Sequence, residues 1–357
     1  MSDITIIYGM DAKEMTAALL RDIAFEKRLD SGMNVVIKPN LVVAKPASEG
    51  ATTHPEIVEG IILFLKDYGM KSPVIAEGSW LGETTDRAFE RCGYTALAKK
   101  YGLKLLDTKK DKVIKRNTHG LTLGVCEIVA NADFLINVPV LKGHCQTTLT
   151  CCLKNMKGCI PDSEKRRYHD IGLHEPIAAL NTILKPGLHV IDSICGDPTF
   201  EEGGKPVVSN RILAGTDPVL LDSYGAALLG YNPASIGYLR YAAEYGLGKL
   251  FDTDTAIREL QTENRPKTNP AGQSDLVRRL AKHIDEQNAC SACYAALIFA
   301  LNKTGTRHLK DKIKIGQGFR GKKCSGLGVG NCTAGCDRHI PGCPPTATEI
   351  IKGLEDK

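Results

Sequence analysis

Short apolar segments alternate with amphipathic helical segments through residues 1–250, and this alternation constrains the fold more than any other feature of the chain. Asn34–Ile37, for example, is an apolar run that ends at Pro39, and apolar residues then recur at helical spacing until Gly69. Strands that alternate with helices predict an α/β fold, with a largely parallel sheet flanked by helices.

The same patterns predict the other elements of this region. Strands are expected at Asp3–Tyr8, Val74–Ala76, Leu103–Leu106, Asp133–Val138, Leu188–Ile191 and Arg211–Ala214. Helices are expected at Ala12–Arg28, Thr85–Cys92, Ala96–Tyr101 and Val219–Leu229.

Ligands of parallel sheets bind beyond the carboxyl ends of the strands, where Lys38, Glu77, the Lys142 region, Asp192 and Asp217 fall. No carboxylate lies between Val138 and Pro161, so the segment around Lys142 reads as cationic. A cleft with such a lining concentrates anions.

We therefore expect a small anionic ligand in a pocket of this region. Lys142 and Lys154 are the expected binding residues, and Lys38 and His54 are expected to contribute from neighbouring loops. His144 is the expected proton donor, because histidine titrates near neutral pH. The alternative is that these residues are surface lysines and structural histidines.

Two other binding motifs are weaker. Asp192, Asp217 and Asp222 could bind Mg²⁺, but Asp217-Pro218 reads equally well as a turn and helix cap. The glycines of 326–330 do not predict a nucleotide site, because a cysteine and not a helix start follows them.

Several short strings of this region occur together in the order known from one family. They are Lys38-Pro39-Asn40, Thr53-His54-Pro55, Leu141-Lys142-Gly143-His144, Leu153-Lys154-Asn155 with Gly158, and Asp217-Pro218 with Asp222. From Asn34 to Gly248 the chain thus resembles the family of domain of unknown function 362, some members of which carry an added iron–sulfur region. The resemblance implies little about mechanism.

Thirteen cysteines are present, and the C-terminal ones have metal-ligand spacing. Cys290 and Cys293 lie three residues apart at the start of an expected helix, so that both face one way, at the end of the helix that favours negative charge. Cys332 and Cys343 would complete four thiolates, the usual number for a [4Fe–4S] cluster. Zinc is the alternative metal, and Cys324 and Cys336 are alternative fourth ligands.

The C-terminal motif, Cys-x-x-Cys, then Gly-x-Cys, then Pro-Gly-Cys-Pro-Pro, resembles the proximal cluster site of hydrogenase small subunits. It is also similar to the homologous small subunit of respiratory complex I, in which the first two cysteines are adjacent. The resemblance implies Cys290, Cys293, Cys332 and Cys343 as the ligands. For Cys145, Cys151, Cys152 and Cys159 we favour buried packing or one redox-active thiol over a second cluster.

A polar segment with prolines and asparagines divides the chain. We expect an α/β domain over residues 1–250, a linker over 251–273 and a small cysteine-rich α/β region that binds the cluster over 274–357. In the last region helices are expected at Ser274–Gln287 and Tyr294–Asn302, a strand at Lys312–Ile315 and a glycine-rich loop at Gly316–Gly330.

Composition excludes several classes of protein. The net charge is +5 over 357 residues, and no run of five like charges occurs, so nothing indicates nucleic-acid binding. The N-terminus lacks the features of a signal peptide, and the apolar runs are too short to span a membrane. A cytoplasmic location follows, where thiols stay reduced and clustered cysteines indicate metal or redox chemistry.

The sequence thus predicts a cytoplasmic iron–sulfur redox protein, an electron carrier or a reductase, that acts on an anionic ligand and has a redox partner protein. A non-redox acid–base enzyme with a structural cluster, and a protein that delivers a metal or cofactor, are the alternatives.

Overall fold

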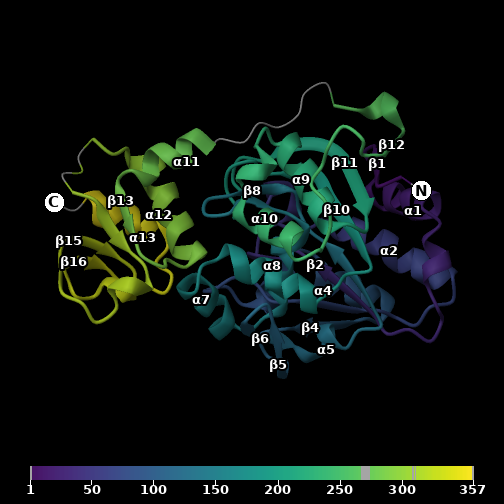
Figure 1. The fold of residues 1–357 in the computed structure, drawn as a ribbon, viewed down its shortest axis with the longest axis horizontal. Coiled ribbons are helices and arrows are strands. Elements are labelled where there is room, and N and C mark those ends of the chain that lie inside the picture. Colours follow the sequence, from purple (N-terminus) through teal and green to yellow (C-terminus); the bar gives the residue numbers. More distant parts are fainter. Residues whose placement is uncertain (1, 267–273, 308, 310, 356–357) are drawn as a thin grey trace. The chain divides into compact units, whose positions relative to one another are not determined.

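The computed structural model describes residues 2–266, 274–307, 309 and 311–355, which form two compact units (Figure 1). The large unit comprises Met1–Ser79, Glu83–Glu164 and His174–Gly272, and the small unit comprises Trp80–Gly82, Lys165–Leu173 and Gln273–Lys357. The small unit therefore includes two short segments from the middle of the chain.

An eight-stranded sheet forms the centre of the large unit. In spatial order its strands are β12 (Ile257–Leu260), β1 (Ile4–Tyr8), β11 (Val207–Gly215), β10 (Leu188–Gly196), β7 (Phe134–Val138), β2 (Val35–Pro39), β3 (Val74–Glu77) and β4 (Lys104–Asp107). All of these strands run in one direction except β11, which is antiparallel to both of its neighbours. The predicted largely parallel sheet is confirmed.

Helices cover both faces of this sheet. One face packs against α1 (Ala12–Asp22), α2 (Pro55–Asp67), α3 (Thr85–Arg91) and α4 (Tyr94–Tyr101) around a core that includes Ile136 and Val138. Asn137 lies between these two residues and so points to the other face, where its amide donates to the Cys152 carbonyl. That face carries α6 (Cys152–Asn155), α8 (His174–Ile183), α9 (Pro218–Leu228) and α10 (Gly237–Glu244).

Several short elements complete this part of the chain. They are the hairpin of β5 (Val113–Thr118) and β6 (Leu121–Cys126), the hairpin of β8 (Lys142–His144) and β9 (Thr148–Thr150), and the helices α5 (Glu127–Ala130) and α7 (Asp162–Asp170).

The small unit contains a four-stranded sheet in which every strand is parallel to its neighbours. Its strands are β13 (Ile284–Glu286), β14 (Ile313–Ile315), β15 (Cys324–Val329) and β16 (Cys336–Ile340), and its helices are α11 (Ser274–Ala281), α12 (Ser291–Thr304) and α13 (Ala347–Glu355). Buried Leu297, Ile298 and Leu301 of α12 pack in its core with Ile350 of α13. The predicted small cysteine-rich α/β region is confirmed.

The structure differs from the predicted elements in several places. The helix expected over Ala12–Arg28 ends at Asp22, and a short 3-10 helix, Phe25–Arg28, follows it. The helix expected over Ser274–Gln287 ends at Ala281, and β13 follows it. The loop expected over Gly316–Gly330 contains β15, whose glycines lower its strand propensity. The expected linker, 251–273, contains β12 in the large sheet, and residues 267–273 lie outside the described residues. The domain boundaries therefore stay predictions.

Among the described residues, no helix has both the length and the apolar character that crossing a bilayer requires.

Candidate functional site

The carboxyl ends of the small sheet bring the four predicted cluster cysteines to one place. Because the strands are parallel, the segments that follow them meet at one edge of the sheet. Cys290 and Cys293 follow β13 at the start of α12, Cys332 follows β15, and Cys343 follows β16. All four line one cavity of the small unit.

Backbone contacts hold the two loops of this cavity together. The Gly330 and Asn331 N–H groups donate to the carbonyls of Ile340 and Gly342 at 2.8 and 2.9 Å, and the Gly342 N–H donates to Asn331 Oδ1 at 2.7 Å. Gly330 has φ of 91°, and a Cβ there would lie 3.8 Å from Cys293 Sγ. Glycine therefore keeps the space beside the sulfur open.

Cys293 lies in the first turn of α12 and is partly buried. Burial raises the pKa of its thiol, and the neighbouring Cys290, Cys343 and Cys332 raise it further. A guanidinium nitrogen of Arg320 donates to Cys332 Sγ at 3.5 Å, whereas Cys343 is exposed. The cavity therefore combines close thiols with an arginine at its wall.

The alternative ligands Cys324 and Cys336 do not belong to this set. They are paired residues on β15 and β16, and their sulfurs form a disulfide at 1.98 Å. Neither sulfur is then a thiolate, so the disulfide does not favour either of them as a ligand.

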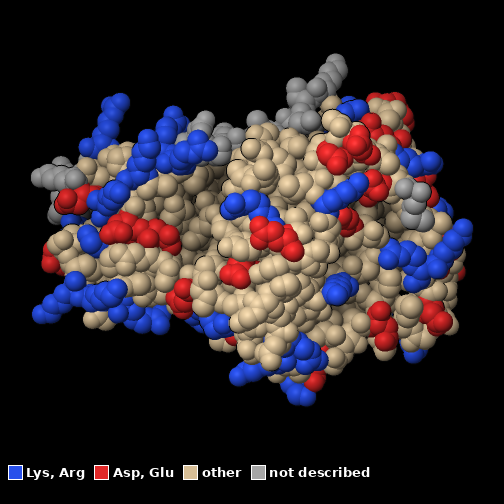
Figure 2. Space-filling view, viewed as in Figure 1, with Lys and Arg blue, Asp and Glu red and all other residues tan. Residues whose placement is uncertain are grey.

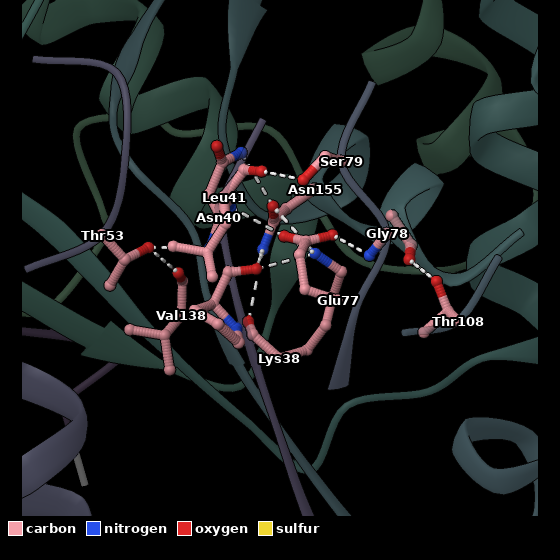
Figure 3. Close-up of polar contacts among 12 residues, drawn as sticks. Lys38, Asn40, Leu41, Thr53, Glu77, Gly78, Ser79, Thr108, Val138 and Asn155 are labelled. Carbon is pink, nitrogen blue, oxygen red and sulfur yellow. Dashed lines mark hydrogen bonds and ion pairs between the residues drawn. The ribbon is translucent and has the colours of Figure 1, made fainter. Parts of the chain in front are cut away.

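The carboxyl edge of the large sheet carries a buried ion pair (Figure 3). Lys38 Nζ lies 2.8 Å from Glu77 Oε2 and also donates to Pro39 O and Asn155 Oδ1 at 2.7 and 3.3 Å. The other Glu77 oxygen accepts from the Gly78 N–H at 2.7 Å. Gly158 packs directly on this pair, since a Cβ at Gly158 would lie 2.0 Å from Glu77 Oε1.

A second buried network joins Lys142, His144 and Lys154 through Glu201. His144 Nε2 and Lys154 Nζ both lie 3.0 Å from Glu201 Oε2. Lys142 Nζ donates to Asn40 Oδ1 at 3.2 Å, to the Glu201 carbonyl at 2.7 Å and to the Ala51 carbonyl. The expected convergence of these three side chains is therefore present.

Burial has strong effects on the charges of this network. It lowers the pKa of Lys142 to about 7, although Glu201 acts in the opposite direction. Burial also opposes ionisation of Glu201, but His144 and Lys154 outweigh it and hold its pKa well below the usual range. Burial raises the pKa of the adjacent Glu202 to about 7.

The two histidines of this edge differ in access and in charge. His144 is buried, its Nδ1 accepts from the Gln146 and Thr147 N–H groups at 3.1 Å, and burial lowers its pKa to about 4. His54 is partly exposed, and its Nδ1 lies 2.8 Å from the fully buried Asp192. Burial opposes protonation of His54, but the charge and hydrogen bond of Asp192 outweigh it and raise the pKa.

Glu201 is the functional-site residue that the sequence argument missed. The segment from Val138 to Pro161 contains no carboxylate, but Glu201 reaches Lys154 from a distant loop and Glu77 reaches Lys38 from β3. A buried lysine needs an acceptor for its charge, so burial of these lysines would have predicted that carboxylates lie nearby. It would not have shown which carboxylates these are.

The three aspartates considered as magnesium ligands each contact different groups. Asp217 follows the antiparallel β11, so it lies at the opposite edge of the sheet, where it caps α9 by accepting from the Val219 and Leu220 N–H groups. Asp222 accepts from the Cys152 and Leu153 N–H groups, and Asp192 holds His54. The helix-cap interpretation of Asp217 is thus the one that the contacts favour.

Cys151, Cys152 and Asp222 form the group of close ligand atoms among the described residues, with all three atoms within 4.8 Å of one another. All three residues are fully buried, and both carboxylate oxygens of Asp222 already accept backbone N–H groups. Cys159 is also fully buried, which fits the expected packing role of these cysteines, whereas Cys145 is partly exposed.

Comparison with known proteins adds a family and a relative. The family model described as DUF362, domain of unknown function, matches residues 35–227. A thylakoid-associated protein of Synechocystis sp. is 26% identical over 223 residues, which cover 60% of this chain and 69% of that protein.

Two solved structures have weaker similarity. The lactate racemase apoprotein from Thermoanaerobacterium thermosaccharolyticum is 13% identical, with 67% of this chain and 56% of that chain covered and a TM-score of 0.37. A protein from Thermotoga maritima is 12% identical, with 52% and 51% covered and a TM-score of 0.34. The chain therefore spans little more than half of each solved protein, and similarity at this level does not assign a function.

Proposed function

The chain belongs to the DUF362 family, whose description names no activity, and we propose that it is an iron–sulfur redox protein, an electron carrier or a reductase. Cys290, Cys293, Cys332 and Cys343 bind a [4Fe–4S] cluster in this proposal. The observation that carries it is the position of these cysteines, from three separate segments, around one cavity. Four thiolates are the usual ligand set of such a cluster, which would supply one-electron transfer.

The geometry of the cavity supports a cluster over a single zinc ion. Four sulfurs around one zinc ion, at bonds of about 2.3 Å, lie within roughly 4 Å of one another. Among the described residues, the group with ligand atoms that close is Cys151, Cys152 and Asp222, and not the cavity cysteines. A cube holds its thiolates farther apart than a single zinc ion does, and Arg320, which donates to Cys332 Sγ, offsets part of the negative charge that four thiolates bring.

Anaerobic purification with iron and sulfide analysis tests this proposal. The wild type is expected to hold about four irons and four sulfides per chain and to give an EPR signal after reduction. Each Cys→Ser variant of the four ligands is expected to lose most of its iron, whereas Cys92→Ser, a matched change in the large unit, keeps it. Zinc without sulfide, or full iron in all four variants, contradicts the proposal.

The second part of the proposal is a small anionic ligand at the carboxyl edge of the large sheet. Lys38, Lys142 and Lys154 are buried and bonded to protein acceptors, so their role is to fix the loops around the ligand. His54 takes the role of contact residue, because its ring is accessible and Asp192 favours its charged form.

Thermal shift measurements with inorganic phosphate and malonate test the ligand site. Both anions are expected to raise the Tm of the wild type and of His144→Gln, because binding to the folded state alone stabilises it. His54→Gln is expected to lose the shift. An unchanged shift in His54→Gln contradicts the assignment of His54.

The contact between His54 and Asp192 also favours a second candidate function, non-redox acid–base catalysis. A buried carboxylate that accepts from Nδ1 fixes the tautomer and leaves Nε2 for proton transfer. Under this candidate, removal of the cluster by a ligand variant leaves turnover intact, and under the redox proposal it abolishes turnover.

A cytoplasmic location remains part of the proposal, because a thiolate-bound cluster needs reduced cysteines. The Cys324–Cys336 disulfide weighs against it, since disulfides are rare in that compartment. Cell fractionation with an antibody to the protein decides the matter.

A further inference from the structure

The small unit carries a groove next to the thiol cavity. It lies between the edge strand β16 and α13, has a volume of about 350 Å³, and is lined by Arg338, His339, Pro341, Glu349 and Lys352 among others. Arg338 and Lys352 are exposed. The groove thus offers two cationic side chains and one histidine against a single carboxylate.

The groove is adjacent to the cavity along the chain. Pro341 lines the groove, and Gly342 and Cys343, the next two residues, line the cavity. Cys343 is the exposed member of the four cysteines. A molecule seated in the groove would therefore contact a residue two positions from Cys343 along the chain.

Positive charge is concentrated in this part of the sequence. Residues 274–357 contain 14 Lys and Arg against eight Asp and Glu, whereas residues 1–273 contain 32 against 33. Blue side chains accordingly gather over the elements β13–β16 and α11–α13 (Figure 2). Like charge disfavours a second copy of this surface as the occupant, and an acidic surface is favoured.

We propose that this groove docks a small acidic electron-carrier protein, which exchanges electrons with the cysteine site beside it. The identity of the partner rests on the proposed redox function, whereas the preference for an acidic surface rests on the charges alone. Encounters between redox proteins use small interfaces, so a few charged residues around one groove can set the choice of partner. In the exchange one electron passes between the carrier and the cluster, so one is oxidised as the other is reduced.

Binding of a fluorescently labelled acidic bacterial ferredoxin tests the groove. Anisotropy titrations are expected to show binding at low ionic strength that weakens at about 0.15 M salt. The double variant Arg338→Glu, Lys352→Glu is expected to bind about tenfold more weakly at low ionic strength, because complementary surface becomes like-charged. Lys352→Glu alone, at an exposed position, is expected to give part of this loss and guards against misfolding of the double variant.

The matched control is Arg91→Glu, Lys99→Glu, two exposed positions of the large unit with the same change in net charge. Its affinity is expected to stay within about twofold of the wild type, since the groove is untouched. Equal losses in the groove variant and in the control would overturn the proposal, as would binding that is insensitive to salt. Tighter binding of a DNA duplex than of the ferredoxin would overturn it as well.

The same titration with the Cys343→Ser variant separates this proposal from the redox function. Salt-dependent binding that persists in Cys343→Ser after its iron is lost supports the docking surface and shows that it does not depend on the cluster. A protein with a full cluster that does not bind the ferredoxin overturns the docking surface and leaves the cluster in place.

Discussion

The two sheets of this protein place their polar chemistry at the same kind of edge but fill it in opposite ways. At the carboxyl edge of the large sheet, cations are buried and bonded to protein acceptors: Lys38 pairs with Glu77, Lys154 pairs with Glu201, and Lys142 donates to Asn40 and to two backbone carbonyls. At the carboxyl edge of the small sheet, four cysteines line a cavity together with Arg166 and Arg320.

This difference separates side chains that hold a fold from side chains that hold a ligand. A buried lysine with three acceptors has no capacity left for another partner, whatever its charge. Four thiolates in one cavity repel one another unless a metal offsets their charge. Residue type and strand position predict which polar side chains lie at each edge. Whether those side chains can bind a ligand depends on the protein groups that they already contact.

The largest expected effect comes from removal of a buried partner. Glu77→Gln leaves the Lys38 ammonium buried without its counter-charge, so we expect the free energy of unfolding to fall by roughly 3–5 kcal/mol. Guanidinium denaturation of wild type and variant measures the loss.

An exposed pair provides the control for this change. Asp86→Asn breaks the contact with Lys110, in which both side chains are largely exposed, and is expected to cost far less than Glu77→Gln because solvent screens the pair. Similar losses in the two variants would remove the distinction between the buried edge and the surface.

The next effect concerns how the small unit is held together. Cys324→Ser removes the disulfide to Cys336, and we expect the free energy of unfolding to fall by roughly 2–4 kcal/mol while iron content stays full. Cys343→Ser is expected to lose iron. A loss of iron in Cys324→Ser as large as in Cys343→Ser would place Cys324 among the ligands.

The third effect distinguishes the two histidines by pH. The pKa of His144 is expected near 4, so the folded state binds fewer protons than the unfolded state between about pH 6.5 and 4. Stability then falls as the pH drops through this window, and His144→Gln is expected to flatten the slope. Denaturation curves collected across the window measure it.

His54 is expected to behave with the opposite sign. Its raised pKa means that the folded state binds the proton more tightly, so its contribution is present at low pH and is lost as the pH rises through the folded pKa. Asp192→Asn is expected to lower the pKa of His54 in an NMR titration. A His54 pKa that does not respond to Asp192→Asn would contradict the assigned contact.

The smallest expected effect lies at the edge of the large sheet that carries no candidate site. Asp217→Ala removes the cap of α9 and is expected to cost about 1 kcal/mol with no change in iron content or anion binding. A change in anion binding would show that Asp217 acts at the ligand site after all.

Local patterns predicted the fold because most strands and helices have a recognisable pattern of apolar residues within a short stretch of sequence. The run before Pro39 and the helix before Gly69 were identified in this way, and β2 and α2 lie there. Sheet order was not predictable, since β1 pairs with β11 and β12, which are distant from it in sequence. β15 was not predicted, because it contains two glycines and glycine is disfavoured in strands.

The candidate sites divide along the same line. Spacing and residue type brought Cys290, Cys293, Cys332 and Cys343 into one set, and all four line one cavity, although metal binding itself stays a proposal. The pocket of the large unit was predicted from its cations alone. Glu201 lies 47 residues from Lys154 along the chain, so the pairing of these two charges depends on tertiary structure.

The composition of the small unit has a consequence for any attempt to isolate or transplant it. Leu81 and Arg166, from two stretches well upstream, line the cysteine cavity, and the Arg166 carbonyl accepts from Gln317 Nε2 at 3.0 Å. A fragment that starts at residue 274 would carry every cysteine of the set and still lack part of the wall around them. The four cysteines lie in one continuous segment of the sequence, but part of the wall of their cavity comes from residues outside that segment.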